Sequence, residues 1–327
     1  MRRTGLVAMV AGLLVGGLVA PAASAPVRTA AGSGRGAAAP AVDATVHVSP
    51  DGRNEGDGTK SAPVADIAGV ERVVAKRGAT GAVTVLFRGG TYRLPQQQLH
   101  PTGARSIDFA AEPGTGRPVF DGGRTAEYWL KVMPTETRLS FTGFTVLRYT
   151  IGGIMLRGTG TGPGKRITGA TIRGNVFKEI GGPASGFGAV HLNYADHTLI
   201  QNNAFLDLVN GECGGCMHGV YLALESNDNR VTGTTTFARV SGDPVRVTDF
   251  SNRNTVSGAT FDHTGTHAAL SVWRLPDRPR QCSSGNVLYS DESAITGFTG
   301  EPLPAVAEGS KPEEGPCPDA VRLEPAG

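Results

Sequence analysis

Residues 174–177 read Gly-Asn-Val-Phe, and phenylalanine closes a similar short segment three more times, as Asn-Asn-Ala-Phe at 202–205, Thr-Thr-Thr-Phe at 234–237 and Gly-Ala-Thr-Phe at 258–261. The four phenylalanines are 28, 32 and 24 residues apart. A recurrence of this length is the signature of stacked structural repeats. The spacing therefore predicts a β-solenoid in which each period forms one turn of the coil.

A second series of short segments lies between these phenylalanines, each with the pattern apolar, variable, apolar. This alternation is typical of a strand with one face buried, and the β-branched residues and intervening glycines disfavour helix. Strands one coil apart stack in parallel, so each position becomes a ladder along the axis. We predict two inward ladders, formed by Ile154, Val190, Val220, Val245 and Leu270 and, two residues further on, by Leu156, Leu192, Leu222, Val247 and Val272.

The N-terminal end carries a different pattern. A segment from Val64 to Lys76 has helical spacing, with Ile67, Val70 and Val74 on one face. A strand from 83 to 87 follows it. Because the first coil of a solenoid exposes both core and strand edge, we expect this helix to cover that end.

These motifs resemble the pectate-lyase-like right-handed parallel β-helix superfamily. Val48-Ser-Pro-Asp-Gly52, a short helix and Arg88-Gly-Gly-Thr-Tyr92 look like its opening coil, and Ser226-Asn-Asp-Asn-Arg-Val-Thr-Gly233 and Ser251-Asn-Arg-Asn-Thr-Val-Ser-Gly258 look like its later coils. The resemblance implies an all-β, single-stranded right-handed parallel β-helix with an N-terminal capping helix. It implies no single activity, because the superfamily includes lyases, hydrolases, epimerases and proteins without known chemistry.

The ends of the chain differ in composition from the coils. Residues 1–25 have a basic start, an apolar stretch and an Ala-Ser-Ala cleavage site, which predict a signal peptide and secretion. Residues 26–41 are rich in Ala, Gly, Pro and Ser, which predicts a flexible linker. We assign residues 42–300 to the β-helix and residues 301–327 to a Pro- and Glu-rich tail that a disulfide ties back.

Charge and cysteine content narrow the class further. The formal charge is +2 with both signs interspersed, which disfavours nucleic acid or a membrane surface as partner. Four cysteines in a secreted chain favour disulfides. We expect Cys213 to pair with Cys216 and Cys282 with Cys317, and a zinc site is the less favoured alternative. We also expect a monomer.

The outward positions of the second series hold the candidate site. The middle column reads Met155, His191, Tyr221, Arg246 and Ser271, and a neighbouring column, aligned less certainly, reads Gly152, Gly188, His218, Asp243 and Ala268. A third column reads Arg157, Asn193, Ala223, Thr248 and Trp273. Neighbouring coils are about 4.8 Å apart, so these side chains share one face. Inert β surfaces favour Thr, Ser, Lys and Glu instead.

Such a set suits chemistry on an acidic polysaccharide. Arg246 would neutralise a uronate carboxylate, His191 or His218 would remove the C5 proton, and Tyr221 would donate or relay a proton. Asp243 would orient a histidine or hold Arg246. As binding groups we name Asn193 and Trp273. Trp273 would either stack on a sugar ring or cover the core.

Plainer interpretations stand beside these roles. Exposed histidines on strands are often ordinary surface, and Asp243 before Pro244 would set a turn. Asp249, Glu225 and Asp228 have the positions of turn residues. The columns supply only Asp243 as a carboxylate, so we expect no cofactor and do not favour the calcium site of pectate lyases.

The sequence leaves three functions open. We favour a metal-independent lyase or C5-epimerase acting on an extracellular acidic polysaccharide. The alternatives are a non-catalytic carbohydrate-binding or cell-surface β-helix, and a glycoside hydrolase with Asp243 and either Asp249 or Glu225 as its carboxylates.

Overall fold

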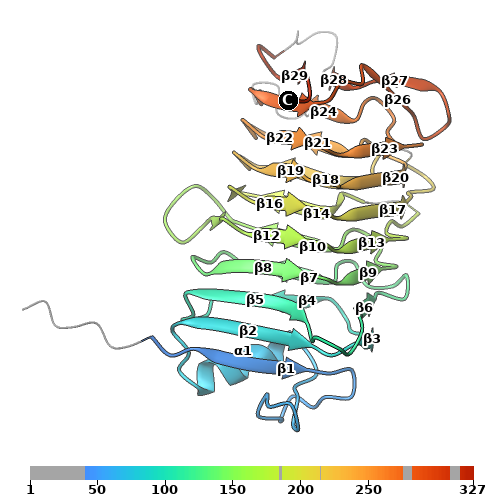
Figure 1. Cartoon of the computed structure of the whole chain (residues 1–327). Helices are drawn as coiled ribbons and strands as arrows, with labels where there is room; N and C mark the ends of the chain where they lie inside the picture. The colour runs from blue at the N-terminus through green and yellow to red at the C-terminus, as the bar shows by residue number, and fades with distance from the viewer. Residues whose placement is uncertain (1–40, 184–185, 214, 275–281, 310–316) are drawn as a thin grey trace, which may run out of the picture. The chain divides into compact units, whose positions relative to one another are not determined.

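The computed structural model describes residues 41–183, 186–213, 215–274, 282–309 and 317–327. The predicted signal peptide, 1–25, and residues 26–40 of the predicted linker lie outside the described residues, so secretion remains a prediction. The described chain winds through three long parallel sheets, each taking one strand from successive coils (Figure 1). The predicted parallel β-helix is confirmed.

The strands have these bounds. The first sheet contains β1 (Ala44–Val48), β2 (Ala82–Phe87), β5 (Ser106–Ala111), β8 (Arg138–Thr142), β12 (Thr171–Arg173), β16 (Leu199–Gln201), β19 (Arg230–Thr232), β22 (Thr255–Ser257), β25 (Asn286–Tyr289) and β29 (Val321–Glu324). The second contains β3 (Gly90–Tyr92), β6 (Pro118–Asp121), β9 (Thr145–Leu147), β13 (Val176–Lys178), β17 (Ala204–Leu208), β20 (Thr236–Val240) and β23 (Thr260–Asp262).

The third sheet carries the candidate site. It contains β4 (Gln97–Leu99), β7 (Leu130–Val132), β10 (Ile154–Arg157), β14 (Gly188–Asn193), β18 (His218–Ala223), β21 (Val245–Val247), β24 (Leu270–Trp273) and β28 (Val306–Gly309). Two small sheets complete the set, β11 (Ile167–Thr168) with β15 (Ala195–Asp196), and antiparallel β26 (Ala294–Thr296) with β27 (Pro302–Pro304).

Both inward ladders form in the predicted register. Ile154 pairs with Val190, Val190 with Val220, Val220 with Val245, and Val245 with Leu270. All ten ladder side chains are buried. The four phenylalanines stack in the second sheet, with ring centroids 5.2, 4.8 and 5.6 Å apart from one coil to the next. A continuous apolar core therefore holds the coils together.

Asparagine ladders, which we did not predict, also run through the turns. The side-chain oxygen of Asn203 accepts from the backbone N–H of Asn175 at 2.9 Å, and its own amide donates to the Ile172 carbonyl. The same arrangement joins Asn229 to Asn254. These side chains are buried, and each satisfies backbone groups that the tight turns leave without strand partners.

The helix α1 (Ile67–Lys76) begins three residues later than predicted. Val64 forms a β-bridge with Val48, and the Asp66 side chain accepts from the Gly69 N–H at 2.9 Å, which caps the helix. The helix packs on β1 and β4, the first strands of two sheets. It therefore covers the first coil as predicted. Within the part of the chain described, no helix is long and apolar enough to cross a membrane.

The C-terminal end departs from the predicted tail. β28 pairs with β24 and β29 pairs with β25, so the coils continue past residue 300. Partly buried Val306, Val321 and Leu323 pack against the core there, a pattern that the surrounding prolines and glutamates obscure in the sequence. Both disulfides join the predicted partners, Cys213 with Cys216 and Cys282 with Cys317, which removes the zinc alternative.

Candidate functional site

The outward face of the third sheet has the predicted middle column. Met155 pairs with His191, His191 with Tyr221, Tyr221 with Arg246, and Arg246 with Ser271. In the adjoining column Gly188 pairs with His218. Alternation along the strands therefore brings the predicted site residues to one face, but their surroundings divide them into two groups.

The first group lines an open groove of about 470 Å³ over β7 to β21. His191, Asn193 and Tyr221 belong to this group. Met155, Arg157 and Ala223 also line it, and these stood in the predicted outward columns without a role; Asp249, predicted as a turn residue or glycosidase carboxylate, lines it too. The sequence had not singled out the other groove residues, which are Glu127, Tyr128, Lys131, Ile151, Phe187 and Leu224.

His191 lies at the floor of the groove and is almost fully buried. Its Nδ1 shares a hydrogen bond of 3.0 Å with the Tyr128 hydroxyl. Phe187 stacks on the ring at 5.1 Å, and Tyr221 meets it edge-on at 5.2 Å. Burial lowers the pKa of His191 to about 4; Lys131 adds to this shift, and a hydrogen bond to Asn193 opposes it. The imidazole is therefore neutral at pH 7.

Tyr221 separates the groove from the second group of predicted residues. Its ring stacks on the His218 ring with centroids 5.5 Å apart, and its hydroxyl accepts from Thr248 Oγ1 at 3.4 Å. His218 is buried, and its Nδ1 donates to the Asp243 carbonyl at 2.8 Å. Burial and the nearby Arg246 lower the pKa of His218 to about 3, so it is also neutral.

Asp243 is the centre of the second group and has no exposed surface. Its Oδ1 accepts backbone N–H bonds from Thr266 and His267, and its Oδ2 accepts from Ser271 Oγ at 2.5 Å. Burial opposes ionisation, but His267, Arg246 and Ser271 outweigh it and hold the pKa of Asp243 well below its usual range. The carboxylate is therefore charged and held within the protein.

Arg246 and Trp273 complete this buried network. Nη2 of Arg246 donates to Asp243 Oδ2 at 2.7 Å, and only 11% of its side chain is exposed. The Trp273 ring covers the guanidinium at 4.5 Å, in the range of a cation–π contact, and Trp273 also packs on Gly309. Thus Arg246, His218 and Asp243 lie beside the groove rather than in its lining, and Trp273 covers Arg246.

The groove has cations of its own. Lys131 Nζ lies 3.4 Å from Glu127 and 4.8 Å from the Tyr128 ring centroid. Arg157, at the end of β10, is exposed, and the described residues offer it no ion pair. The sequence had placed Arg157 in an outward column without giving it a role. Its role becomes visible only in the structure, where Arg246 is paired with Asp243 and Arg157 has no ion pair among the described residues.

The carboxylates interpreted as turn residues do lie in turns. Asp249, Glu225 and Asp228 have positive φ angles of 54°, 57° and 57°. Asp228 pairs with Arg253 at 2.6 Å. Asp249 also lines the groove, at the opposite end from Glu127.

Comparison with known proteins bears on the fold alone. No protein-family model matches the chain, and no curated protein matches it. A solved structure named "Rhamnogalacturonan lyase" is similar with a TM-score of 0.52 and 16% identity, over 75% of this chain and 68% of that one. The chain has the pectate-lyase-like parallel β-helix fold.

Two further solved structures resemble this β-helix more distantly. "The complex structure of XylC with xylose" gives a TM-score of 0.36 at 11% identity, over 75% of this chain and 68% of that one. "Crystal structure of pectate lyase Pel9A" gives 0.28 at 14% identity, over 83% and 79%. Likeness at this level does not extend to activity.

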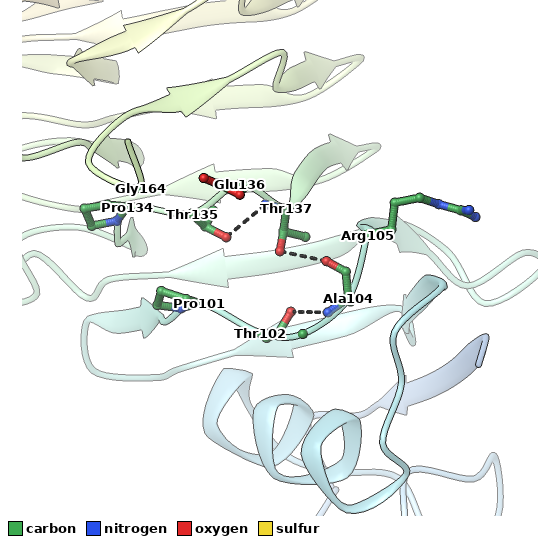
Figure 2. Close-up of a pocket in the computed structure, with 10 residues that line it drawn as sticks. Pro101, Thr102, Ala104, Arg105, Pro134, Thr135, Glu136, Thr137 and Gly164 are labelled. Carbon is green, nitrogen blue, oxygen red and sulfur yellow. Dashed lines mark hydrogen bonds between the residues drawn. The ribbon is translucent and has the colours of Figure 1, made fainter. Parts of the chain in front are cut away.

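Another hollow of the β-helix, of about 490 Å³, lies at the turns before β5 and β8 (Figure 2). Its threonines bond their own turns, since Thr137 donates to the Ala104 carbonyl and Thr102 accepts from the Ala104 N–H. Arg105 points away from it in Figure 2. This hollow therefore presents few free polar groups to a ligand.

Metal ligands do not gather on the described part of the β-helix, where no group of three or more His, Cys, Asp and Glu residues is placed to hold a cation. Both oxygens of Asp243 are already used by hydrogen-bond donors. A reaction without a metal stays a prediction.

Proposed function

We propose that this protein acts on an extracellular acidic polysaccharide, by metal-independent β-elimination or C5 epimerisation in the third-sheet groove. The observation that carries the proposal is the convergence on one open groove of neutral His191, two tyrosines and Arg157, which has no ion pair among the described residues. The comparisons support the fold on which such a groove is built.

Arg157 is the better group to neutralise the substrate carboxylate. Arg246 is paired with Asp243 and covered by Trp273, so using it would break a buried ion pair. Arg157 follows Met155 by two residues, on the strand next to His191. A planar guanidinium can bind a carboxylate through two parallel hydrogen bonds.

His191 and Tyr221 supply the proton transfers. With the carboxylate held, neutral His191 takes the C5 proton, and the electron pair forms a C4–C5 double bond. The bond from C4 to the glycosidic oxygen breaks, and the departing oxygen takes the Tyr221 proton. The substrate's own carboxylate opposes the repulsion from Lys131 and raises the pKa of His191 during the reaction. Epimerisation shares the first step and returns a proton to the opposite face of C5.

Hydrolysis fits the groove less well. Glycosidases place two carboxyl groups about 5–9.5 Å apart. The groove's carboxylates are Glu127, before β7, and Asp249, after β21, and these strands are four steps apart in the sheet. Four steps of about 4.8 Å separate them by roughly 19 Å along the axis.

The test is absorbance of an unsaturated uronate during incubation with polygalacturonate, alginate and hyaluronate, with and without chelator. We expect a chelator-resistant rise on at least one polymer, which Arg157→Ala reduces about a hundredfold. Arg173→Ala is the matched control, because Arg173 is exposed on the first sheet, and it should leave the rate unchanged.

The alternatives predict other results. An epimerase would give no absorbance but would exchange the C5 hydrogen with deuterated solvent. A non-catalytic binding protein would give neither signal and would still bind a polymer. Equal loss in Arg173→Ala and Arg157→Ala would contradict the assignment of Arg157.

A further inference from the structure

A third hollow, of about 460 Å³, lies at the turns that join the second sheet to the third in the first coils. Its lining includes Arg93, Gln96, Asp121 and Ala126. Arg93 follows β3, and Arg124 and Arg148 occupy the corresponding turns after β6 and β9. Arg93 lines the hollow, Arg124 directly follows Gly123 of its lining, and Arg148 binds Asp121 of its lining. We call the hollow together with these three arginines the arginine hollow. Successive coils place its arginines over about 10 Å.

The arginine hollow has an excess of positive charge. Asp121 is the buried carboxylate, and Arg148 binds it through Nε at 2.9 Å and through a second guanidinium nitrogen. Arg93 is 75% exposed, with Nε 3.9 Å from Asp121. Arg148 therefore neutralises Asp121, and the guanidinium of Arg93 remains available to bind a negatively charged ligand.

The outer arginine has a weak partner. Arg124 is 60% exposed and lies 3.4 Å from Glu179, which Lys178 also approaches at 3.2 Å. Four positive groups thus face two carboxylates, a local excess of two charges. Exposed pairs of this length bind weakly, so a carboxylate from outside can compete for Arg124.

Gln96 also lines this hollow. The side-chain oxygen of Gln96 is buried and has no hydrogen-bond partner among the described residues. Buried acceptors are ordinarily paired, and a sugar hydroxyl is a donor of the right kind. Positive charge next to an unused acceptor suits a ligand that has both carboxylates and hydroxyls.

The arginine hollow adjoins the third-sheet groove. Ala126 lines the hollow, and the next residue, Glu127, lines the groove. Their shared wall is fixed, because the Ala126 carbonyl accepts from the Thr150 N–H and the Glu127 carbonyl accepts from the N–H groups of Ile151 and Gly152. A polymer leaving the groove at this end therefore meets the arginines without a flexible segment between.

We propose that the arginine hollow is a distal binding site that holds carboxylates of the polysaccharide outside the reacting groove. The inference rests on the proposed function for the class of polymer, but it requires binding alone and no catalysis. A polymer long enough to reach both regions gains contacts at Arg93 and Arg124, whereas a trisaccharide confined to the groove gains none.

The test compares the double variant R93A/R124A with wild type in affinity electrophoresis through gels containing polygalacturonate, alginate or hyaluronate. We compare affinities for the polymer that retains wild type most strongly. The double variant should bind this polymer about threefold to tenfold more weakly than wild type does, and its binding should depend less on salt concentration. Arg105→Ala is the control, because Arg105 is exposed in a different turn and points away from its own hollow (Figure 2).

Activity provides a second measurement. On a cleaved polymer, KM should rise in the double variant while kcat and trisaccharide turnover stay unchanged. Three results would overturn the distal site: the double variant is retained as strongly as wild type, wild type is not retained in any of the three gels, or Arg105→Ala weakens retention as much as the double variant does. Weaker retention without cleavage of any polymer would support the site and contradict the proposed lyase reaction.

Discussion

Two halves of one sheet face contain the same kinds of side chain in different surroundings. In the groove half, His191 and Tyr221 border open space and have Arg157 nearby. In the covered half, His218 and Arg246 both bond to Asp243, and Trp273 covers Arg246. Residue type and column alone would give both halves the same role. The difference between the halves is that the first lines the open groove and the second does not, so we propose chemistry for the first and positioning of Tyr221 for the second.

The largest effect should come from removing the centre of the covered half. Asp243→Ala leaves Arg246 charged and buried without its partner, so we expect the free energy of unfolding to fall by about 3–5 kcal/mol. Urea denaturation monitored by circular dichroism measures it. Asp262→Ala is the control, because Asp262 is 70% exposed, and should change stability by under about 0.5 kcal/mol. If Asp243→Ala and Asp262→Ala lowered the free energy of unfolding equally, the buried Asp243–Arg246 pair would not stabilise the fold.

Acid should destabilise the protein through both halves. His191 and His218 have pKa values of about 4 and about 3 in the fold, against about 6.5 in the unfolded chain. The unfolded chain therefore binds more protons below pH 6.5, and stability is full above that pH and falls below it. Each histidine contributes a slope that approaches about 1.4 kcal/mol per pH unit near pH 5.

Urea midpoints at pH 7, 6 and 5 test this slope, and His218→Gln should halve it. A pH-independent midpoint over this range would show that the two histidines are not buried in the neutral form.

The groove half should respond in activity instead. His191→Gln removes the proposed base, and we expect the cleavage rate to fall about a hundredfold or more, because general bases contribute factors of that size. Single-turnover rates on the cleaved polymer measure the loss, with polymer retention as evidence that the variant still folds. A rate within twofold of wild type would place the base elsewhere.

The smallest effect tests the boundary between the halves. Trp273→Leu removes the ring over Arg246, which should cost about 1–2 kcal/mol of stability and leave KM unchanged. A rise in KM with little loss of stability would instead show that Trp273 stacks on a sugar. Denaturation and steady-state kinetics on the same sample separate the two results.

The inward face could be predicted from sequence almost residue by residue, and the outward face only by column. Val190, Val220 and Val245 had to face the core because the alternation has a period of two. Nothing local shows that residues 266–268 fold back onto Asp243, or that the strand of Trp273 carries its ring over Arg246. Likewise Tyr128 reaches His191 across 63 positions, a contact that spacing within one repeat does not contain.

The Cys282–Cys317 bond has a mechanical consequence. Each asparagine ladder bonds one coil to the next. A pulling force at the C-terminal end would therefore detach the coils one after another, starting with the last. The bond spans 35 residues, with one cysteine before β25 and the other before β29, the adjacent strand of the same sheet. The final coil is thereby locked as a closed ring, and force applied at the end of the chain must act on this ring before it reaches the coil below.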